Sequence, residues 1–116
     1  VSMVIGEPDA PTATPIAEAG IAAIRSGQVR YTQGLGTTPL RQAIAGWYRT
    51  RYGLDVPHGR IGVMPGSSGA LLMVMGVLLD PGDGVLMADP SYPCNRHFVR
   101  AMEGRAVCLP VGPESA

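Results

Sequence analysis

The stretch from residue 61 to residue 79 constrains the fold most. A short apolar run at residues 61–64 leads into Pro65-Gly66-Ser67-Ser68-Gly69, and residues 70–79 are apolar apart from one glycine. An extended run, a tight turn and a helix together aim the free N–H groups of the helix's first turn at an anion. Glycine permits positive φ and close approach, and the serines add hydroxyl donors. The turn therefore predicts a phosphate site, unless Ser67 simply caps a buried helix.

Composition narrows the possible functions. The chain has 116 residues, 46% of them hydrophobic, and a net charge of zero, so we expect one folded domain without a nucleic-acid or membrane surface. The apolar run at 70–79 is too short to cross a bilayer, and no secretory leader is visible, so we expect a soluble, cytoplasmic protein. Cys94 and Cys108 form neither a disulfide framework nor a metal-ligand pattern, and we expect them to be small apolar residues in a reducing compartment.

Two further features concern the chain as a whole. All nine basic residues are arginines, so the chain contains no lysine. The first residue is Val1, and the last residues trail off after a strand-like run, so we expect a fragment of a longer protein.

The order of elements predicts an α/β fold. Hydrophobic periodicity, proline starts and glycine stops favour helices near residues 15–26, 39–52, 67–79 and 94–103. Short apolar runs favour strands near residues 61–64, 85–88 and 105–109. Strand–helix–strand–helix–strand is two crossover units, so the sheet should be parallel with helices on both faces, as in a three-layer fold. The loops at 65–69 and 89–94 should then share the carboxyl edge, where such sheets bind ligands.

Five segments carry a resemblance to a known family. They are Gly6-Glu7-Pro8-Asp9, Tyr31 with Leu40-Arg41, Pro65 to Leu71, Asp80-Pro81-Gly82-Asp83 and Asp89-Pro90-Ser91-Tyr92-Pro93. In this order and with these gaps the chain resembles fold-type I, pyridoxal-phosphate-dependent aminotransferases of class I/II. The resemblance covers nearly the whole chain but only the N-terminal part of such an enzyme. It implies an N-terminal extended segment at 1–14 and a truncated cofactor-binding α/β domain at 15–116.

The resemblance assigns cofactor contacts to four positions in two loops. Ser67, Ser68 and Gly69 match the cradle for the phosphate of pyridoxal 5'-phosphate. Tyr92 matches an aromatic ring that stacks on the pyridine and supports its role as an electron sink. Without the resemblance, Tyr92 would be read as a loop aromatic that packs on helix 67–79.

Other positions match the family less specifically. Tyr31 matches a tyrosine that reaches across a homodimer to the neighbour's cofactor phosphate, and Gly6 matches a glycine beside the substrate carboxylate. Asn95 stands where polar residues often support the site, whereas His58 and His97 have no match and are expected to be surface histidines.

The resemblance also shows what these residues cannot supply. The family needs a lysine that holds the cofactor through a Schiff base, an aspartate at the pyridine nitrogen and an arginine for the substrate carboxylate, all C-terminal to this segment. We therefore expect no catalytic residue in this chain and no activity from it alone. The parent protein should be an enzyme that moves an amino group between an amino acid and a 2-oxo acid, in amino acid metabolism or a biosynthetic process.

Several alternatives stay open at this point. Other reactions of the same scaffold, such as decarboxylation or elimination, depend on residues outside the chain. A ligand-sensing domain of a transcription regulator would need a DNA-binding segment before residue 1. A general nucleotide-binding domain is disfavoured because the turn matches neither dinucleotide nor P-loop patterns. A non-catalytic fragment would leave sheet edges and apolar faces uncovered and should self-associate.

Overall fold

A computed structural model describes residues 6–115 of the chain. The chain divides into two compact units, Val1–Gln33 and Gly34–Ala116. The two units meet in the loop at 28–33, and the domain boundary expected after residue 14 stays a prediction.

The first unit contains one helix. Helix α1, Thr14–Arg25, has Pro15 within its first two positions, where a missing N–H costs no hydrogen bond. The helix starts one residue before the expected residue 15, and Ala13 is the N-cap residue. The helix ends at Ser26, whose Oγ donates to the Ala23 carbonyl at 2.8 Å.

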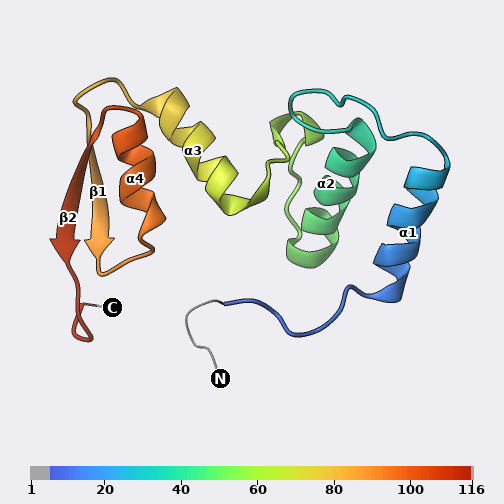
Figure 1. The fold of residues 1–116 in the computed structure, drawn as a ribbon, viewed down its shortest axis with the longest axis horizontal. Helices are drawn as coiled ribbons and strands as arrows, with labels where there is room; N and C mark the ends of the chain where they lie inside the picture. The colour runs from blue at the N-terminus through green and yellow to red at the C-terminus, as the bar shows by residue number, and fades with distance from the viewer. Residues whose placement is uncertain (1–5, 116) are drawn as a thin grey trace. The chain divides into compact units, whose positions relative to one another are not determined.

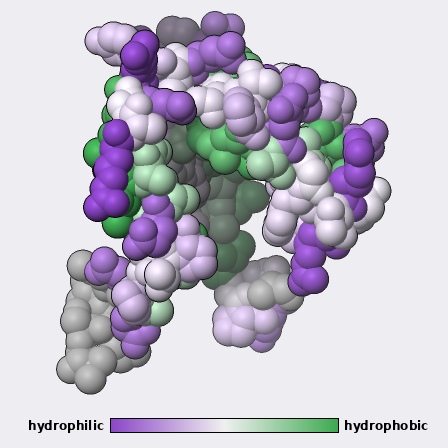
Figure 2. Space-filling view, turned by 90° about the vertical axis from the view of Figure 1, so that its right-hand side faces the viewer, coloured by the Kyte–Doolittle hydropathy of each residue, from purple (hydrophilic) through white to green (hydrophobic). Residues whose placement is uncertain are grey.

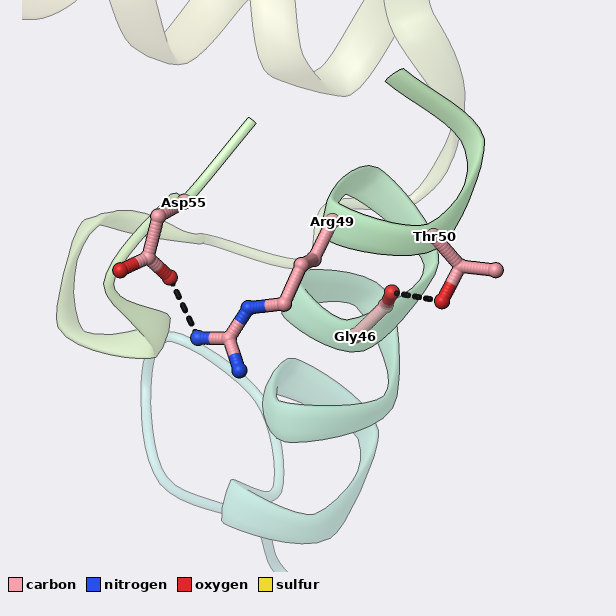
Figure 3. A network of polar contacts seen from close by, with 4 residues as sticks. All are labelled: Gly46, Arg49, Thr50 and Asp55. Carbon is pink, nitrogen blue, oxygen red and sulfur yellow. Dashed lines mark hydrogen bonds and ion pairs between the residues drawn. The ribbon is translucent and has the colours of Figure 1, made fainter. Parts of the chain in front are cut away.

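The second unit opens with helix α2, Thr38–Tyr52, which ends at Gly53 in the left-handed conformation with φ 67°. The chain then folds back along the helix (Figure 3). There the Arg49 guanidinium pairs with Asp55, and the Thr50 hydroxyl donates to the Gly46 carbonyl at 3.0 Å. Arg41 Nε donates to the carbonyl of His58, the first residue of the short 3₁₀ helix η1, His58–Arg60, at 3.0 Å. The contacts of Arg49 and Arg41 tie the 53–60 segment to α2, whereas the Thr50 bond lies within the helix.

Residues 61–64 do not form the expected strand. The Val63 N–H donates to the Leu35 carbonyl at 3.0 Å, but no ladder of paired residues follows. An apolar run becomes a strand only beside a partner strand, and β1 pairs with β2 rather than with this segment. The sheet therefore has two strands among the described residues.

The rest of the second unit alternates helices and strands. Helix α3, Gly66–Leu78, is followed by strand β1, Gly84–Asp89, helix α4, Cys94–Ala101, and strand β2, Arg105–Pro110. Strands β1 and β2 lie side by side and parallel, in register from Gly84 opposite Arg105 to Asp89 opposite Pro110 (Figure 1). The α/β class and the parallel sheet that the sequence predicts are confirmed.

The tightest packing lies where α4 meets the sheet. The side chain of Val99 is fully buried, and a Cβ placed on Gly104 would come within 2.9 Å of Val99 Cγ1. Helix α4 stops at Ala101, two residues before the expected end, and Glu103 has φ 59° just before Gly104. Val99 therefore anchors α4 at the end of the helix opposite to the Tyr92 loop.

Helix α3 is apolar yet exposed, although its sequence predicts burial on most faces. The exposed fraction is 78% for Val77 and 71% for Leu78. Figure 2 shows hydrophobic residues at the surface beside hydrophilic ones. The difference arises because few described elements pack against α3. None of the helices in residues 6–115 is long and apolar enough to cross a membrane.

Candidate functional site

The first turn of α3 is shaped by its glycines. Gly66 has φ 74°, a left-handed conformation that favours glycine, and its N–H donates to the Met64 carbonyl at 2.8 Å. A Cβ on Gly69 would lie 2.9 Å from Pro65 Cγ, so glycine permits Pro65 to close onto the helix. The turn before α3 thus depends on glycine at two positions for two different reasons.

Ser67 does not cap the helix. Helix α3 begins at Gly66, Pro65 is the N-cap residue, and no side chain makes a capping hydrogen bond. Ser67 and Ser68 lie inside the first turn, where backbone N–H groups have no partner within the helix. The first turn contains no acidic residue. Hydroxyl and N–H donors therefore converge at the positive end of the helix dipole, a set suited to an anion.

Tyr92 lies in the loop between β1 and α4, and the structure brings it to Ser68. Its carbonyl accepts a hydrogen bond from the Asn95 N–H at 3.3 Å, while its ring is exposed. A hydrogen bond to the Cys94 thiol, together with the thiolate charge, raises the pKa of Tyr92 above its ordinary value of 10.0. A hydrogen bond with the Ser68 hydroxyl acts in the opposite direction on this pKa. The interaction of Ser68 with Tyr92 links loop 65–69 to loop 89–94. The expectation that both loops follow strands of one sheet is wrong for the first loop, because residues 61–64 form no strand.

Two residues around Tyr92 were not identified by sequence reasoning as part of this arrangement. Cys94 was interpreted as a small apolar residue, yet its thiol raises the pKa of the Tyr92 phenol. Arg96 Nη2 lies 3.4 Å from Asp89 Oδ1, across the loop that holds Tyr92. The opposite charges of Asp89 and Arg96 on either side of one short loop are the signal that could have indicated the ion pair.

Asn95 contributes a buried acceptor. Its Oδ1 atom is buried and has no hydrogen-bond partner within the described residues 6–115. Such an atom is costly to leave unpaired, which makes Asn95 a candidate for contact with a further polar group.

Gly6 and Tyr31 belong to the first unit. Tyr31 is fully exposed, and a Cβ on Gly6 would meet nothing within 4 Å. Ser68 and Tyr92 belong to the second unit, and the roles of Gly6 and Tyr31 stay predictions. His58 and His97 are both exposed, and His58 offers only its backbone carbonyl to Arg41.

The donor set fits a phosphorylated cofactor with an aromatic ring. Ser67 and Ser68 offer hydroxyl and backbone donors at a helix N-terminus, without a carboxylate in the first turn to repel a dianion. The exposed ring of Tyr92, linked to Ser68, leaves a flat apolar surface beside the phosphate position.

Comparisons with known proteins agree on one family. The family model described as aminotransferase class I and II matches residues 1–114. The valine–pyruvate aminotransferase of Mycobacterium tuberculosis is 36% identical over 115 residues, which cover 99% of this chain and 30% of that protein. A (5-formylfuran-3-yl)methyl phosphate transaminase of Methanocaldococcus jannaschii is 35% identical, with 92% and 29% covered.

Solved structures give the same result. The crystal structure of an aminotransferase from Mycobacterium tuberculosis matches with a TM-score of 0.90 and 37% identity, and the match covers 95% of this chain and 30% of that one. The chain thus spans about 30% of the length of the relatives it matches.

Proposed function

The chain belongs to the class I and II aminotransferase family, and we propose that residues 66–69 and Tyr92 form part of a pyridoxal 5'-phosphate site. The observation that carries the proposal is the first turn of α3, where Ser67 and Ser68 add hydroxyl donors to backbone N–H groups that lack partners within the helix, with no acidic residue in that turn. The protein containing this site would transfer an amino group between an amino acid and a 2-oxo acid.

Each residue of the site has a distinct task in this proposal. Ser67 and Ser68 bind the phosphate through hydroxyl and backbone N–H groups, and Gly69 lets the turn close against Pro65. Tyr92 packs its ring on the pyridine and keeps it in one plane. The bound cofactor supplies an electron sink for the amino acid carbon, and these residues orient it for that chemistry.

The remaining machinery lies outside residues 1–116. The chain contains no lysine, so we expect residues 1–116 alone to catalyse no amino transfer. A homodimer belongs to the same proposal and is supported by the fully exposed side chain of Tyr31, which is free to reach a second subunit. A cytoplasmic location also belongs to it, supported by the free thiols Cys94 and Cys108.

The proposal is tested by amino transfer with the protein as its gene encodes it. Because one relative is a valine–pyruvate aminotransferase, the first substrates are valine and pyruvate, followed by a panel of amino acids with 2-oxo acids. We expect a 2-oxo acid and a new amino acid to form in equal amounts, and only with pyridoxal phosphate present. Absence of transfer across the panel by cofactor-loaded protein would contradict the proposed activity.

Two serine variants, one at the expected phosphate site and one outside it, test which hydroxyl binds the phosphate. Ser68→Ala should lower the affinity for pyridoxal phosphate about tenfold or more, because it removes a charge-assisted donor. Ser91→Ala removes an exposed hydroxyl from the Tyr92 loop and should leave that affinity unchanged. Equal affinities in the two variants would show that Ser68 does not contact the phosphate.

A further inference from the structure

The loop that carries Tyr92 runs between two well-anchored ends. At one end, Asp89 is the last residue of strand β1 and is in register with Pro110. Its backbone carbonyl accepts a hydrogen bond from the Val111 N–H at 3.0 Å. At the other end, α4 begins at Cys94 and is fixed further along by the fully buried side chain of Val99. Residues 90–93 therefore connect two elements whose own positions are set by the sheet and the core.

One side-chain contact bridges these ends. Arg96, in the first turn of α4, places Nη2 3.4 Å from Asp89 Oδ1. The side chains are 34% and 49% exposed, so solvent screens the pair only in part. Arg100, one turn along the same helix, is exposed and makes no side-chain ion pair among residues 6–115. Arg96 thus contacts Asp89 across the loop, and Arg100 is a matched arginine on the same helix without that contact.

We propose that Arg96 is a positioning residue, which with Asp89 closes the 90–93 loop and holds the Tyr92 ring where Ser68 meets it. The inference rests on the proposed function, since it concerns how the ring is presented to the cofactor. The side-chain hydrogen bond of Arg96 goes to Asp89 and, among residues 6–115, not to Ser68 or Tyr92, so Arg96 acts through the loop. Without the bridge, the loop samples more conformations, and part of the binding free energy is spent on ordering it.

The test compares Arg96→Gln with Arg100→Gln in the protein as its gene encodes it. Affinity for pyridoxal phosphate is measured by fluorescence titration. We expect Arg96→Gln to bind about two- to fivefold more weakly, the range of a partly exposed ion pair, and Arg100→Gln to bind like the wild type. The charge-swapped pair Asp89→Arg/Arg96→Asp should recover part of the loss.

A double-mutant cycle separates positioning from a general structural effect. If Arg96 acts through Tyr92, then Arg96→Gln should cause no further loss of affinity in a Tyr92→Ala background. The same loss in both backgrounds, or equal affinities for Arg96→Gln and Arg100→Gln, would overturn the inference while the proposed function stands. A wild-type protein that binds no pyridoxal phosphate would overturn the proposed function and this inference together.

Discussion

Among the individual residues of this site, Tyr92 has a pKa that responds to two neighbours, Ser68 and Cys94. Donation to the thiolate stabilises the protonated phenol, whereas donation from Ser68 stabilises the phenolate. The first effect is larger, so the pKa of Tyr92 is raised.

Replacing Cys94 should therefore change the titration of Tyr92. Cys94→Ala removes the group that raises the pKa of Tyr92 and leaves Ser68, which lowers it. We therefore expect the pKa of Tyr92 to fall in this variant. The measurement is the ultraviolet absorbance of tyrosinate against pH, with Tyr92→Phe subtracted to isolate this residue. An unchanged or higher midpoint for Tyr92 in the variant would contradict the contact with the thiol.

At the scale of elements, helices α2 and α3 both contain glycine but need it differently. A Cβ on Gly46, within α2, would meet nothing within 4 Å. A Cβ on Gly69, in the first turn of α3, would lie 2.9 Å from Pro65 Cγ and 3.1 Å from Pro65 Cδ. The proline ring cannot move aside as a flexible side chain would, so the turn before α3 would have to shift.

The two glycines make a matched pair of variants. Gly46→Ala should raise the free energy of unfolding by about 0.5–1 kcal/mol, because alanine loses less backbone entropy in a helix. Gly69→Ala should lower it by about 1–3 kcal/mol, the usual cost of overpacking. Urea unfolding followed by circular dichroism measures both. A Gly69→Ala variant as stable as Gly46→Ala would show that α3 does not close against Pro65.

Local signals in the sequence predict the helices and the parallel pair β1 and β2 well, since proline starts, glycine stops and apolar runs act over a few residues. They fail at residues 61–64, because a strand also depends on a partner that local pattern does not reveal. They also fail at Ser67, where the helix starts one residue earlier than expected and Pro65 takes the cap position. The interactions of Tyr92 with Ser68 and Cys94 depend on side-chain geometry, which the local pattern does not reveal.

At the scale of the whole molecule, apolar residues remain exposed in each compact unit. Ile24 of α1 is 69% exposed, and the end of α3 exposes Val77 and Leu78 still more. Among the described residues 6–115, Val99 is the single fully buried side chain. Exposed apolar surface of this kind drives association in water.

Residues 1–116 expressed alone should therefore self-associate, with a mass above the 12.1 kDa of one chain in sedimentation velocity. Val77→Lys/Leu78→Lys should reduce this association if α3 mediates it, because lysine keeps its charge in water. Ile24→Lys in α1 is the control and should have the smaller effect. A stable 12.1 kDa monomer at micromolar concentration would show that the exposed face of α3 needs no cover.

The relative affinity for pyridoxal phosphate and for pyridoxal is the first measurement to make on the protein as its gene encodes it. The two molecules differ only in the phosphate, so their ratio isolates what residues 66–69 contribute. We expect pyridoxal phosphate to bind about a hundredfold more tightly, and Ser67→Ala/Ser68→Ala to remove most of that difference. Equal affinities in the wild type, or a ratio that the double variant leaves unchanged, would contradict a phosphate site at the start of α3.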